Sequence, residues 1–140
     1  MRLLCGSLQG RVGPIQLKLP ALMLHLRLPP GARLNLALPD VDFEHCVYGI
    51  QAHAGNLQLD EATPLVRGSF ALMAVGASQI QLHHAVAAED SAEVFVLGGA
   101  RAPRPLVFGG PFVLDSRAAL TRAQQRYASG QMGRLDGVPF

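Results

Sequence analysis

The sequence has no tryptophan, two cysteines and few charged residues, which fill 16% of its 140 positions. Two cysteines, Cys5 and Cys46, are too few for the disulfide framework of a small secreted protein. We therefore expect two free thiols in a reducing compartment, with one disulfide between them as the alternative. The apolar start of the chain, residues 1–10, is too short for the core of a signal peptide, which favours a cytoplasmic location.

Long apolar runs and a strong net charge are missing as well. No stretch approaches the roughly 18 apolar residues that a membrane-spanning helix needs. The formal net charge is only +2, which is too small to indicate nucleic-acid binding. We expect a soluble protein that has neither a membrane nor a nucleic acid as a direct partner.

Before residue 117 the sequence shows alternation with a period of two in place of helical periodicity. Leucine or isoleucine recurs at every second position over residues 15–19, 22–28 and 34–38, which is typical of half-buried strands. Ten prolines and fifteen glycines divide the chain into short pieces. Further strands are predicted at residues 44–53, 56–59, 69–74, 78–83 and 93–97. Many short strands at this spacing predict a β-sandwich or β-barrel in a single domain over residues 1–140.

The last third of the chain predicts one helix after the strands. Asp115 or Ser116 offers an N-cap side chain, and Gly130 stands where a C-terminal glycine cap belongs. One apolar face is formed by Leu120, Ala123 and Tyr127. Upstream, the apolar run before Gly98 and Gly99 predicts a buried strand that these two glycines end in a turn.

This last third resembles the end of the C-terminal half of the pirin family, a branch of the cupin superfamily. The matching positions are Leu97, Gly98, Gly99, Pro105, Gly110, Pro111, Phe112, Val113, Asp115 and Ser116. Fainter likenesses at residues 2–15, 22–40 and 46–59 extend the resemblance over nearly the whole chain. It implies an all-β fold: one cupin-type β-barrel (double-stranded β-helix or jelly roll) over about residues 1–114, with a short C-terminal helix over about residues 116–129. Typical pirins hold two such barrels in one chain, and the N-terminal barrel has no counterpart in this sequence.

The resemblance also directs attention to a metal, because cupins hold one through three histidines and a glutamate, and pirins do so in their N-terminal half. That site opens with a His-x-His pair, which this sequence lacks. On an unbroken strand, His45 and His53 would share a face but lie roughly 26 Å apart. His83 and His84 are adjacent, so their rings would point to opposite faces of a strand. We expect no metal, no other cofactor and no catalytic residue; if a metal site exists, its candidates are His45, His53 and His83.

Three hypotheses about function follow. The leading one is a metal-free, non-catalytic interaction or regulatory module that forms a homodimer resembling a two-barrel pirin, because a lone half would expose the apolar surface that its sister barrel covers. The second is a small dioxygenase-like enzyme of the quercetinase type with a non-standard metal site. The third is a subunit that completes a separately encoded N-terminal pirin half. The resemblance to pirins associates the protein with redox or transcriptional regulation.

Overall fold

The computed structural model describes residues 1–38, 42–53, 55–60, 62–101 and 105–133. The chain divides into two compact units, Met1–Arg101 and Ala102–Phe140. The strands of the first unit are β1 (Arg2–Cys5), β2 (Ser7–Leu8), β3 (Arg11–Val12), β4 (Ala21–Leu28), β5 (Arg33–Ala37), β6 (Phe43–Gln51), β7 (Leu57–Leu59), β8 (Thr63–Pro64), β9 (Phe70–Leu72), β10 (Gln79–His84) and β11 (Ala92–Ala100). The second unit contains β12 (Val107–Gly109), β13 (Phe112–Leu114) and α1 (Arg117–Ala128).

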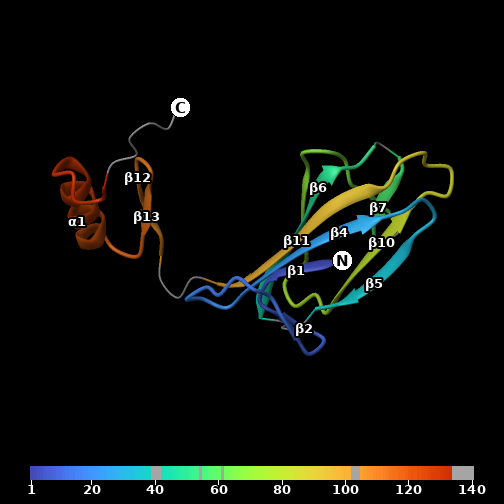
Figure 1. Cartoon of the computed structure of the whole chain (residues 1–140), viewed down its shortest axis with the longest axis horizontal. Coiled ribbons are helices and arrows are strands. Elements are labelled where there is room, and N and C mark those ends of the chain that lie inside the picture. The colour runs from blue at the N-terminus through green and yellow to red at the C-terminus, as the bar shows by residue number, and fades with distance from the viewer. Residues whose placement is uncertain (39–41, 54, 61, 102–104, 134–140) are drawn as a thin grey trace. The chain divides into compact units, whose positions relative to one another are not determined.

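The first unit is built from two main sheets that face one another (Figure 1). One sheet has five strands in the order β1-β4-β11-β6-β9, and the other has four in the order β5-β10-β7-β8. Between β4 and β11 the chain passes back and forth between the two sheets, and the paired strands run antiparallel. This is the jelly-roll form of a β-barrel, so the predicted all-β fold class is confirmed. The barrel consists of two facing sheets and not of one closed sheet.

The core between the sheets follows from the leucine alternation. In β4 the residues at positions 22, 24, 26 and 28 are buried, whereas those between them are partly or largely exposed. Leu36, Ile80 and Leu82 enter the same core from the four-stranded sheet. Burial of each such side chain contributes about 1.5–3 kcal/mol, so these alternating positions hold the two layers together. The strands predicted around residues 22–28 and 34–38 are therefore confirmed.

The strand predicted over residues 15–19 is wrong. Ile15, Leu17 and Leu19 are 48%, 61% and 55% exposed, and Ile15 makes a single isolated bridge with Cys5. Prolines at positions 14 and 20 enclose this segment, and proline cannot donate a backbone hydrogen bond to a sheet ladder. The alternation is present here, but none of the described strands extends along the segment.

The turn predicted at Gly98 and Gly99 is also wrong, because both glycines lie inside β11. This strand is central in its sheet and pairs with β4 and β6 along its length. Gly98 lies opposite His45, and a Cβ atom at position 98 would come within 2.5 Å of Cδ2 of that ring. Glycine is needed here to make room for a buried imidazole, and not to reverse the chain.

The second unit is a short hairpin, β12 and β13, with helix α1 packed on it. Ser116 caps the helix: its side-chain oxygen accepts a hydrogen bond from the backbone N–H of Ala119 at 3.2 Å. Gly130 follows the helix with φ of +72°, the left-handed conformation that favours glycine. The rings of Phe112 and Tyr127 meet edge to face at 6.0 Å, which attaches the last turn of the helix to the hairpin. Over the described residues, no helix has the length and apolar character needed to cross a bilayer.

Candidate functional surfaces

The histidines that the sequence offered as metal ligands lie in different environments. His45 is buried, and its ring lies against Gly98. The ring centroids of His45 and Phe43 are 5.9 Å apart. His53 follows β6 and is exposed. On β10 the two neighbours point apart: His83 is half-buried on the outer face, and His84 is buried with Nδ1 3.0 Å from the carbonyl oxygen of Pro29. The opposite orientation predicted for this adjacent pair is confirmed.

These donors do not fit the cupin metal site of three histidines and a glutamate. Among the residues that the structure describes, no group of three His, Cys, Asp or Glu side chains is arranged to hold a metal ion. The space between the sheets is occupied by buried leucine, isoleucine and valine side chains, with His45 and His84 as the buried polar residues described there.

The outer face of the five-stranded sheet is apolar, which is unusual for the solvent side of a sheet. Two rows of side chains cross it. One row contains His25, Phe95, Tyr48 and Phe70, and the other contains Met23, Leu97, Cys46 and Leu72. We call the seven members other than His25 the apolar outer face. Phe70 is 66% exposed and Leu72 is 78% exposed, both on the edge strand β9, and the rings of Tyr48 and Phe70 lie 4.7 Å apart.

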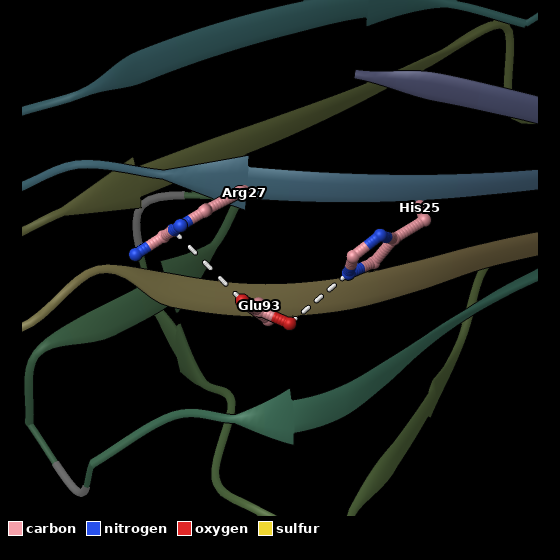
Figure 2. Close-up of polar contacts among 3 residues, drawn as sticks. All are labelled: His25, Arg27 and Glu93. Atoms are coloured by element: carbon pink, nitrogen blue, oxygen red, sulfur yellow. Dashed lines mark hydrogen bonds and ion pairs between the residues drawn. The ribbon is translucent and has the colours of Figure 1, made fainter.

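Charged side chains lie at both ends of this face, and each group contains its own counter-charge. At one end the carboxylate of Glu93 on β11 lies between two residues of β4, as Figure 2 shows. Its Oε2 is 3.1 Å from Nε2 of His25, and its Oε1 is 3.8 Å from Nε of Arg27. At the other end Arg101 donates two hydrogen bonds, at 2.9 and 2.8 Å, to Oε1 of Glu44. The apolar outer face is thus bordered by paired charges.

Cys46 lies inside the apolar outer face and does not form a thiol–imidazole pair with its neighbour His45. The two side chains leave β6 on opposite sides, His45 into the core and Cys46 outward. Burial raises the pKa of the Cys46 thiol above its usual value, because a thiolate loses hydration there. The thiol form is therefore favoured, which is the reverse of what an activated nucleophile needs. Both cysteines are free.

This chain has the features of a cupin-class domain: a two-sheet jelly roll with an alternating leucine core, followed in sequence by a short C-terminal helix. Residues 23–133 match the family model of the pirin C-terminal cupin domain. The chain belongs to the pirin family, as a C-terminal cupin domain.

Similar proteins extend this result. The chain is 31% identical over 138 residues to a protein of Pseudomonas aeruginosa named "Putative quercetin 2,3-dioxygenase PA1205", and the match covers 97% of this chain but 41% of that protein. Two crystal structures of quercetin 2,3-dioxygenase from Acinetobacter baumannii share the fold of this chain, with TM-scores of 0.79 and 0.78 at 19% and 15% sequence identity. They are matched over 94% and 99% of this chain and over 43% and 44% of theirs. The chain thus spans less than half the length of these relatives.

Sequence reasoning did not identify the apolar outer face. A signal was present: Val94, Phe95, Val96 and Leu97 are apolar without alternation, which is typical of a strand covered on both sides. The core covers Val94 and Val96 on one side. Phe95 and Leu97 point to the other side, where no described element of the first unit forms a covering layer.

Proposed function

We propose that this pirin C-terminal cupin domain is a metal-free, non-catalytic interaction and regulatory module that works as a homodimer. In the dimer, two copies cover each other's apolar outer face and so imitate a two-barrel pirin. The observation that carries the proposal is that face, with Phe70 and Leu72 largely exposed at its edge. Contiguous apolar surface of this kind marks interaction sites in soluble proteins.

The makeup of the apolar outer face argues for a second copy as the occupant. Its two rows of side chains are apolar across β4, β11, β6 and β9, so the face of one copy can cover the face of another. A two-fold axis sets the same patch against itself, and the apolar outer face suits such contact because the charges at its ends are already paired.

The proposal includes no catalysis because the histidine side chains do not converge on one point. Quercetin dioxygenation belongs to the names of the relatives, which are more than twice as long as this chain. An enzyme of that type would need histidines converging on one point, whereas His45 enters the core, His83 faces outward and His53 is exposed after β6. In the described part of the first unit, the positions of these histidines favour the interaction module over the enzyme hypothesis.

Light scattering coupled to gel filtration tests the proposal. The wild-type protein is expected at about twice 14.9 kDa at protein concentrations of tens of micromolar. Replacing both Phe70 and Leu72 with lysine places two charges in the contact and is expected to give the monomer mass. Val86→Lys is the matched control, because Val86 is 81% exposed and lies outside the apolar outer face; it is expected to leave the dimer intact.

Three results would contradict the proposal. A wild-type monomer at every concentration would remove the homodimer. If that monomer bound tightly to a separately encoded N-terminal pirin half, the third hypothesis would replace the homodimer. A dimer that survives the Phe70 and Leu72 double substitution would place the contact elsewhere on the chain.

A further inference from the structure

The outer face of the four-stranded sheet carries a hollow of about 410 Å³ that differs in chemistry from the apolar outer face. Its polar lining comes from three neighbouring strands. The residues are Arg33 and Asn35 on β5, Gln81 and His83 on β10, and Gln58 on β7. Small-molecule sites commonly have volumes of about 300–1,000 Å³, so the hollow accommodates a ligand at the small end of this range.

Sheet register brings these groups together. His83 lies directly opposite Arg33 on one side and opposite Gln58 on the other, and Gln81 lies opposite Asn35. Directly opposite residues have Cβ atoms about 4.5–5.5 Å apart, so the five side chains form one continuous patch. His83, Gln58 and Gln81 are half-buried although they leave the outer face of the sheet.

The hydrogen-bonding capacity of this patch is unused within the described part of the chain. None of its five side chains makes an intramolecular hydrogen bond or ion pair there. The five-stranded sheet differs, since Arg27 on β4 and Arg101 just after β11 each have a glutamate partner. Among the described residues, no acidic side chain lines the hollow. Asp60 lies beside it and accepts a hydrogen bond from the backbone N–H of Gln81.

We propose that this hollow binds a small polar molecule that carries an oxyanion group, a phosphate or a carboxylate. The guanidinium of Arg33 offers the forked donor pair that both anions accept. His83 adds a ring nitrogen beside it, and the amides of Asn35, Gln58 and Gln81 provide donors and acceptors for neutral groups of the ligand. The site lies on the sheet opposite the apolar outer face, so it does not depend on the proposed dimer.

Chemical-shift titration of the ¹⁵N-labelled full chain tests the site with three probes. Glucose 6-phosphate and citrate present the two oxyanions, and glucose is the neutral match of the first. We expect saturable shifts for one of the oxyanions, confined to amides of β5, β7 and β10, and none for glucose. Whether glucose 6-phosphate or citrate produces them decides between phosphate and carboxylate.

Variants separate a built site from general attraction to a positive charge. Arg33→Gln is expected to weaken binding about tenfold, a change of about 1.4 kcal/mol. Arg11→Gln removes the same charge from the exposed strand β3 and is expected to leave affinity unchanged, as is the Phe70 and Leu72 double substitution. The proposal is overturned if neither anion gives saturable shifts, if glucose binds as well as its phosphate, or if Arg33→Gln and Arg11→Gln behave alike.

Discussion

Replacement of Gly98 by alanine tests how the core of the first unit is built. The added Cβ atom would lie 2.5 Å from Cδ2 and 2.9 Å from Nε2 of His45. Contacts this short force either the buried ring or strand β11 to move, and overpacking of this kind costs about 1–3 kcal/mol. For a unit of about 100 residues, each kcal/mol lowers the melting temperature by about 4–8 °C.

The neighbouring glycine provides the matched control. A Cβ atom at Gly99 would have the carbonyl oxygen of Pro20 as its nearest neighbour, at 3.8 Å, which is ordinary contact. Gly99→Ala is therefore expected to leave stability unchanged or to raise it by about 0.4–1 kcal/mol through the unfolded state. Thermal unfolding followed by circular dichroism measures both variants on the same strand.

A double-mutant cycle assigns the effect to the imidazole. If the clash with His45 is the cause, Gly98→Ala costs less in a His45→Ala background than in the wild type. A clash with His45 is ruled out if Gly98→Ala and Gly99→Ala unfold at the same temperature, or if the cost of Gly98→Ala is unchanged when the ring is removed.

Three further predictions concern single side chains. Ser116→Ala removes the N-cap acceptor of α1 and is expected to destabilise the helix by about 0.5–2 kcal/mol, seen as lost helical ellipticity and faster amide exchange in the second unit; an unchanged helix would contradict the cap. Because the pKa of the Cys46 thiol is raised, the pH at which iodoacetamide reacts at half its maximal rate is expected to be higher in the native protein than in urea. The stability that the buried thiol contributes is complete below the unfolded-state pKa, and it is lost as the pH rises through the folded-state pKa. A native midpoint at or below the unfolded one would contradict the burial argument. Glu93→Gln breaks partly exposed ion pairs and is expected to cost about 1 kcal/mol or less in chemical denaturation, so a loss of several kcal/mol would show that the carboxylate has a larger structural role.

Local pattern was sufficient to predict those parts of the fold where one face of an element meets the core. The leucines of β4 and the orientation of His83 and His84 on β10 follow from the period of a strand alone. Local chemistry also narrowed the N-cap of α1 to Asp115 or Ser116, and the structure shows that Ser116 is the cap. These features depend on the residues next to them in sequence and on a core that any such strand must face.

Features that depend on residues far apart in the sequence could not be predicted from local pattern. Residues 15–19 alternate like β4, but no strand extends beside them between their flanking prolines. Position 98 lies in a strand because β11 pairs with β4 and β6, and it is glycine because the buried ring of His45, 53 positions earlier in the chain, leaves no room for a Cβ atom. The polar hollow likewise joins Arg33, Gln58 and His83 through sheet register, which no single segment encodes.

The proposed homodimer joins two copies of the chain through the apolar outer face. The most direct measurement is an isotope-filtered NOE experiment on a mixture of ¹³C-labelled and unlabelled protein. We expect intermolecular NOEs among the side chains of Met23, Leu97 and Leu72, and none from Val86. Absence of intermolecular NOEs at concentrations where a dimer should form, or NOEs confined to another surface, would contradict it.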